Sequence, residues 1–108
     1  MVRAELDALP GEPAMVNDRA LAETAHPLLR RAGFVRAPPM RSCGSDDFGF
    51  YGGLARTLMV FVGVGSPDAP LHSPCFLPPA ESVRAVARAQ AVAFVAAASA
   101  RSAERDGP

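Results

Sequence analysis

The feature that most constrains this chain is a nearly unbroken apolar run at residues 58–64, followed by a proline-rich loop. The run, LMVFVGV, is rich in valine, and such runs are typical of strands that are covered on both faces of a sheet. Gly63 and Gly65 end the run, and three prolines between residues 66 and 74 exclude a helix in the loop. The loop presents His72 beside the end of the predicted strand, where open α/β sheets place ligands and catalytic groups.

Length, charge and cysteine content exclude several classes of function. The 108 residues allow one domain at most, and a hydrophobic content of 49% is typical of a globular chain rather than a disordered one. The 11 basic and 11 acidic residues balance, so no electrostatic signal indicates a nucleic-acid or anionic-membrane partner. No apolar run reaches the length of a membrane span, and acidic residues and prolines near the N-terminus do not fit a signal peptide. We therefore expect no nucleic acid and no membrane as partners, and a cytoplasmic location for a chain with two cysteines.

A first helix is predicted to end at about Ala32. Its apolar face consists of Leu21, Ala25, Leu28, Leu29 and Ala32. Asn17 or Asp18 is a candidate N-cap, and Gly33 stops the helix. Pro27 would cost about 3 kcal/mol inside a regular helix, so we expect a kink or two shorter helices there. The preceding His26 has no acidic or cysteine neighbour at ligand spacing and is predicted to be a surface residue.

A second helix is predicted to start near Glu81 and to run to about Ala98. Its predicted core-facing stripe consists of Val83, Val86, Ala87, Ala91, Phe94, Val95 and Ala98. Two further strands are predicted, Val2 to Leu9 with alternating apolar and charged residues, and Phe34 to Ala37. The polar tail at 99–108 is predicted to fray.

A second stretch of chemical interest, CGSDDFGFYGG, occupies residues 43–53. Ser45 can cap a short helix, and Asp46 and Asp47 in its first turn would interact favourably with the helix dipole. The aromatic side chains of this helix are predicted to pin it to the core; they are Phe48, Phe50 and Tyr51. Two aspartates and a histidine on adjacent loops do not by themselves define a chemistry.

Four motifs in a fixed order resemble one enzyme family. They are PAMVNDRALAETA, GSDDFGFY, MVFVGVG, and LHSPCF followed by an acidic helix start. Their order and spacing resemble the C-terminal part of the metal-dependent amidohydrolases and peptidases that include hippurate hydrolase, auxin-conjugate hydrolase and aminoacylase. The resemblance implies an α/β fold in which residues 13–98 form the C-terminal part of a mixed-sheet, zinc-peptidase-like catalytic domain. Residues 1–12 would be the last strand of a lid (dimerisation) domain with its linker, and residues 99–108 a frayed tail.

The resemblance also assigns site residues, a cofactor and partners. It places a metal ligand at His72, for a divalent metal that is usually zinc, with manganese, cobalt or nickel as alternatives. The GSDDF turn would supply active-site support rather than ligands, through Gly44, Ser45, Asp46 and Asp47. The lid domain of relatives implies a homodimer.

The motifs that supply the other metal ligands and the general-base glutamate in relatives are missing from these residues. A catalytic zinc generally needs three protein ligands and an open position for water. We therefore expect a fragment of an amidohydrolase that is inactive on its own and works with a missing N-terminal half. The substrate of the complete enzyme would be an N-acyl amino acid or a peptide-like amide.

Two alternatives stay open. Cys43 and Cys75 together with His72 permit a small Cys2His zinc site in a non-catalytic interaction module, although this spacing fits no standard zinc motif and buried cysteines commonly act as small hydrophobes. A disulfide between the two cysteines is also open. Alternatively, the fragment associates without catalysis, either with a separately encoded half or with a copy of itself. Cys75 stands where relatives commonly have a basic or polar residue, which leaves the substrate preference open.

Overall fold

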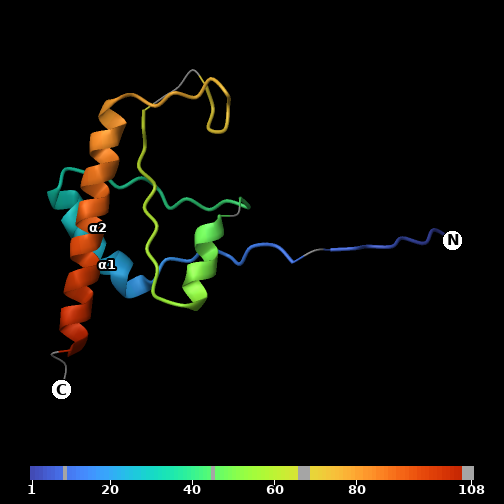
Figure 1. Ribbon diagram of the computed structural model, residues 1–108, viewed down its shortest axis with the longest axis horizontal. Helices are drawn as coiled ribbons and strands as arrows, with labels where there is room; N and C mark the ends of the chain where they lie inside the picture. Colours follow the sequence, from blue (N-terminus) through green and yellow to red (C-terminus); the bar gives the residue numbers. More distant parts are fainter. Residues whose placement is uncertain (9, 45, 66–68, 106–108) are drawn as a thin grey trace.

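The computed structural model describes residues 1–8, 10–44, 46–65 and 69–105, of which 102–105 as backbone only. Within these ranges the chain forms three helices and no strand: α1 (Arg19–Arg31), the 3-10 helix η1 (Asp47–Gly53) and α2 (Glu81–Arg105). The two α-helices pack against each other, and most of the remaining chain, including η1, extends to one side of this pair (Figure 1). The prediction of an α/β fold with a mixed sheet is therefore wrong.

The boundaries of α1 follow from local sequence signals. The Oδ1 atom of Asp18 accepts a hydrogen bond from the N–H of Leu21 at 2.8 Å, which confirms the predicted N-cap. At the other end, Gly33 has a φ of 85° and so takes the left-handed conformation. The N–H of Phe34 donates to the carbonyl of Leu29 at 3.0 Å and completes a Schellman motif. The chain therefore leaves α1 in a sharp reversal.

Helix α1 continues through Pro27 as one element of 13 residues, so the predicted division into two shorter helices is wrong. Pro27 removes one internal hydrogen bond, but the helix is capped at both ends and packs against α2. The predicted apolar face is confirmed. Leu21 and Ala25 are buried, and the remaining members of the face, Leu28, Leu29 and Ala32, are half-buried.

Helix α2 packs through a different face from the one predicted. Its covered side chains are small: Ala89 and Ala96 are buried, and Ser82, Ala85, Val92 and Ala93 are half-buried on the same side. The larger side chains of the predicted core-facing stripe are exposed, Val83 by 72% and Phe94 by 76%. An alanine-rich helix has two apolar stripes on opposite sides, and periodicity alone does not indicate which stripe is covered. The helix also extends to Arg105, through most of the tail that was predicted to fray.

None of the three predicted strands forms in the described part of the chain. Residues 1–8 are irregular and exposed, and residues 34–37 and 58–64 are irregular as well. Leu9, the last residue of the first predicted strand, lies outside the described residues. A strand needs a neighbour that satisfies its backbone N–H and carbonyl groups. No described segment runs beside residues 58–64 as such a neighbour, so their strong strand propensity has no ladder to join.

One local pairing anchors the chain at the start of that apolar run. The N–H of Asp18 donates to the carbonyl of Thr57 at 2.8 Å. The side-chain amide of Asn17 bonds to Met59 twice, accepting from its N–H at 2.7 Å and donating to its carbonyl at 2.9 Å. Thr57 is buried, and its Oγ1 donates to the carbonyl of Val16 at 3.4 Å. The side-chain amide of Asn17 thus satisfies both backbone groups of Met59, as a neighbouring strand would.

The predicted short helix is present as the 3-10 helix η1. Its N-cap is Asp46, whose Oδ1 accepts a hydrogen bond from the N–H of Phe48 at 2.8 Å. Ser45, the predicted cap, lies outside the described residues. Asp47 lies in the first turn, as predicted, whereas Asp46, which was predicted in the same turn, is the N-cap instead.

Two of the three aromatic side chains of η1 are exposed rather than packed on a core, contrary to the prediction, whereas Phe48 is half-buried. Phe50 and Tyr51 are 56% and 58% exposed. The buried contact is made instead by Gly49, where a Cβ atom would overlap the carbonyl oxygen of Pro13. The fully buried residue of η1 therefore contacts the rest of the chain through its backbone.

The molecule is open, with little interior. Its radius of gyration is 18.1 Å, against about 13 Å for a compact domain of this length. Its accessible surface is 9493 Å², against about 5,700 Å² for a compact protein of this mass. The buried hydrophobic residues among those described are Leu21, Ala25, Ala89 and Ala96. Such a core offsets only a small part of the conformational entropy that folding removes.

Helix α2 has one further property. Over Glu81–Arg101 it is long and apolar enough to cross a membrane, judged by length and composition. The core helices of soluble proteins meet the same criterion, and the segment includes Arg84 and Arg88. This observation does not by itself assign α2 to a membrane.

Candidate functional site

The predicted metal ligand lies in a loop of two successive turns at residues 70–76, which we call the His72 loop. The N–H of Ser73 donates to the carbonyl of Pro70 at 3.0 Å, and the N–H of Phe76 donates to the carbonyl of Ser73 at 3.0 Å. The Oγ of Ser73 also accepts a hydrogen bond from the N–H of Cys75 at 3.2 Å. These three bonds give the His72 loop a defined backbone path.

His72 itself has an unusual backbone conformation. Its φ is 70°, and it is the one non-glycine residue with positive φ in the described part of the chain. It occupies the third position of the turn from Pro70 to Ser73, where a positive φ is characteristic of type II turns and favours glycine. A side chain at such a position costs roughly 1–2 kcal/mol. The imidazole is exposed to solvent.

The predicted supporting residues do not lie beside His72. Asp46 uses its carboxylate to cap η1, and Asp47 is exposed in the first turn of that helix. Gly44 precedes the helix and is exposed, and Ser45 lies outside the described residues. Figure 1 shows η1, in green, well separated from the His72 loop, in orange. The structure therefore does not bring the two stretches of chemical interest together.

The described residues do not on their own fit a catalytic metal. They include no group of three or more His, Cys, Asp or Glu side chains that could hold an ion, whereas a catalytic zinc needs about three protein ligands. Cys43 and Cys75 are both free thiols, and both are exposed. Neither a disulfide nor a Cys2His cluster is therefore formed by these residues, and His72 can act as one ligand of a larger set.

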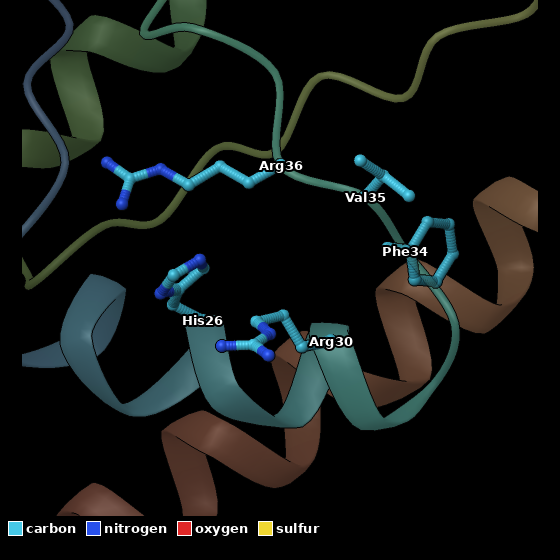
Figure 2. A pocket seen from close by; sticks show the side chains of 5 residues that line it. All are labelled: His26, Arg30, Phe34, Val35 and Arg36. Carbon is cyan, nitrogen blue, oxygen red and sulfur yellow. The ribbon is translucent and has the colours of Figure 1, made fainter.

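A group of side chains that the sequence analysis did not select surrounds an open hollow of about 370 Å³. The residues that line it are His26, Arg30, Phe34, Val35 and Arg36 (Figure 2). The reversal at Gly33 carries residues 34–36 back over α1, so side chains from the helix and from the loop face the same space. We call this site the basic hollow.

His26 lines the basic hollow and is half-buried there. Its Nε2 atom is buried and has no hydrogen-bond partner among the described residues. A buried polar atom without a partner costs roughly 1–3 kcal/mol. The sequence signal that could have found this site is Gly33, because a left-handed residue after a helix predicts that the following residues turn back towards it.

The charge around the basic hollow is unbalanced. Neither an aspartate nor a glutamate lines it, whereas Arg30 and Arg36 both do. A further guanidinium group, of Arg88 on α2, lies 4.9 Å from the centre of the Phe34 ring and holds this wall against the helix pair.

An ion pair forms elsewhere on α1. The Nε atom of Arg19 lies 2.8 Å from a carboxylate oxygen of Glu23, on the exposed surface of the helix. The hydrogen bond from Arg19 to Glu23, and then the negative charge of that carboxylate, raise the pKa of the Arg19 guanidinium above its usual value. Because arginine is already charged at neutral pH, this pair gives the site no proton to exchange.

Comparison with known proteins adds no further assignment. No protein-family model, no curated protein and no solved structure matches this chain.

Proposed function

We propose that this chain contributes the metal ligand His72 to a metal-dependent amidohydrolase whose other ligands and general base lie outside these residues. The proposal starts from the four motifs that resemble the hippurate hydrolase, auxin-conjugate hydrolase and aminoacylase family. The observation that carries it is the backbone of His72, with a φ of 70° in a hydrogen-bonded turn that favours glycine. Strained non-glycine residues are concentrated at functional sites.

The His72 loop suits the role of a ligand carrier. Its hydrogen bonds hold the backbone on both sides of His72, so the imidazole would meet a metal without reordering the chain. Neutral imidazole is a common ligand of divalent metals. Since one imidazole cannot hold a catalytic metal, the chain alone should not hydrolyse amides. The reaction of the complete protein would be hydrolysis of an N-acyl amino acid or a related amide.

The exposed surface supports the need for further protein. The chain exposes about 3,800 Å² more than a compact protein of its mass. A standard interface buries about 800 Å² on each partner, so the excess leaves room for an interface with further protein. Large apolar side chains on α2, such as Val83 and Phe94, lie on this exposed surface. Under this proposal, the part of the enzyme outside these residues covers that surface.

A chimera tests the proposal. Residues 13–98 would replace the corresponding C-terminal segment of an active hippurate hydrolase, and hydrolysis of hippurate and metal content would be measured. We expect metal-dependent activity that falls by more than about 100-fold in His72→Ala. Removing a residue that hydrogen-bonds to a metal ligand already costs about 10–100-fold in activity, and removing the ligand itself should cost more. His26→Gln, at the other histidine of the chain, is the matched control and should keep the activity. A folded chimera that keeps its metal and activity after His72→Ala would contradict the proposal.

The genome provides a second test. We expect the reading frame upstream of the Met1 codon to continue in phase and to encode the remaining histidine, aspartate and glutamate ligands. A stop codon just upstream, with no such half encoded nearby, would favour a non-catalytic binding module instead.

A further inference from the structure

We propose that the basic hollow binds a phosphate group, independently of the amidohydrolase function. Its nitrogen-bearing side chains come from different directions. Arg30 extends from the last turn of α1, Arg36 extends from the loop above, and the imidazole of His26 stands between the helix and Arg36 (Figure 2). A group bound there would meet donors from both elements.

The charge of the hollow indicates the class of ligand. Two guanidinium groups line it without a lining carboxylate to neutralise them. Guanidinium groups bind phosphate and carboxylate through paired hydrogen bonds. Two uncompensated positive charges match a phosphate, which carries close to two negative charges at neutral pH, better than a carboxylate, which carries one.

The hollow also has an apolar wall, formed by Phe34 and Val35. Its volume of about 370 Å³ is within the range of ligand pockets, which start at about 300 Å³, and exceeds the space that a phosphate alone needs. The wall could therefore contact the organic part of a phosphomonoester. The phosphate chemistry is common to free phosphate and to such an ester, and their relative affinities separate the two.

The structure holds the two sides of the hollow in place before any ligand binds. Phe34 is fixed by its hydrogen bond to Leu29 and by the guanidinium of Arg88 above its ring. The Nε2 atom of His26 is buried, so the imidazole helps to shape the hollow, and the exposed guanidinium groups of Arg30 and Arg36 are the donors that a ligand can reach. Preorganisation of this kind reduces the entropic cost of binding.

Proton NMR titration of the full chain with inorganic phosphate tests the proposal. The chain has two histidines, and we expect saturable shifts of the His26 imidazole resonances while those of His72 stay unchanged. Arg30→Gln and Arg36→Gln should each weaken binding by about tenfold, because each removes a charge-assisted donor pair. Arg31→Gln is the matched control, since Arg31 is exposed in the same helical turn and does not line the hollow. It should change binding by less than about twofold.

The outcomes are distinguishable. Tighter binding of phenyl phosphate than of inorganic phosphate assigns the site to a phosphomonoester, and the reverse order assigns it to free phosphate. Tighter binding of benzoate than of both overturns the phosphate assignment. An equal loss of affinity in Arg30→Gln and Arg31→Gln overturns the proposal, because it indicates diffuse attraction. If a glutamine variant loses helical circular dichroism, Arg36→Lys replaces it in the test. This variant keeps the positive charge but loses the paired N–H donors of the guanidinium, so it must still weaken phosphate binding.

Discussion

Single residues set the path of this chain mainly through backbone conformation. Gly33 takes a φ of 85° and returns the chain over α1, as a glycine can without strain. His72 takes a φ of 70° in a turn of similar demand, and its side chain makes that conformation costly. Gly33 and His72 therefore both have a left-handed backbone conformation. Only Gly33, which has no Cβ atom, adopts this conformation without strain.

Substituting His72 should separate backbone strain from side-chain function. His72→Gly removes the strain, whereas His72→Ala keeps it, and both remove the imidazole. We expect the amide hydrogen of Ser73, which bonds to the carbonyl of Pro70, to exchange about fivefold more slowly in His72→Gly than in His72→Ala. Equal exchange rates in the two variants would show that the turn is not strained at this position.

Gly49 should tolerate no side chain. A Cβ atom there would overlap the carbonyl oxygen of Pro13, so Gly49→Ala should destabilise the packing of η1 by about 1–3 kcal/mol. Urea unfolding followed by the fluorescence of Tyr51, in a chain with one tyrosine and no tryptophan, would measure this loss. Gly53→Ala is the control, because a Cβ atom added at Gly53 would meet nothing within 4 Å. A similar midpoint for both variants would contradict the contact.

At the scale of elements, the features set by local signals could be predicted from the sequence. The caps of α1 at Asp18 and Gly33 lie within one turn of the helix that they bound, so the helix forms where expected. The start of α2 at Glu81 follows in the same way. The predicted strand at 58–64 fails because a strand depends on hydrogen bonds to another segment, and propensity says nothing about whether that segment is present.

For the candidate sites too, local features could be predicted from the sequence, whereas contacts between distant segments could not. The proline-rich composition around His72 predicted a non-helical loop, which the two turns from Pro70 to Phe76 bear out. The separation of Asp46 and Asp47 from His72 could not be predicted, because it depends on where η1 packs. The basic hollow was missed because its residues meet only through the reversal at Gly33.

The two stripes of α2 should respond in opposite ways to substitution. Ala96 is buried against α1, so Ala96→Leu should overpack this contact and lower the stability of the isolated chain by about 1–3 kcal/mol. Phe94→Ser, on the exposed stripe, should change it by less than about 0.5 kcal/mol. Thermal unfolding followed by circular dichroism would compare the two. A larger loss from Phe94→Ser would mean that the predicted stripe faces the core after all.

At the scale of the whole molecule, the small interior and the large exposed surface have the same cause. The covered stripe of α2 consists mainly of alanine, which buries little area for each residue, while valine and phenylalanine face outward. The radius of gyration of 18.1 Å also reflects the extended N-terminal segment in Figure 1. A chain with this distribution buries little apolar area for each residue on its own.

The exposed stripe therefore gives the decisive comparison between the isolated chain and the complete protein. In the hippurate hydrolase chimera, Phe94 should be covered by the added protein, and Phe94→Ser should lower the free energy of unfolding by about 3–5 kcal/mol, as for large side chains lost from a core. Arg84→Ser, an exposed position on the same helix, should have little effect in either context. Since Phe94→Ser should be nearly neutral in the isolated chain, the difference between the two contexts measures the burial that the partner supplies. A neutral Phe94→Ser in a folded, active chimera would show that the partner covers another face of the molecule.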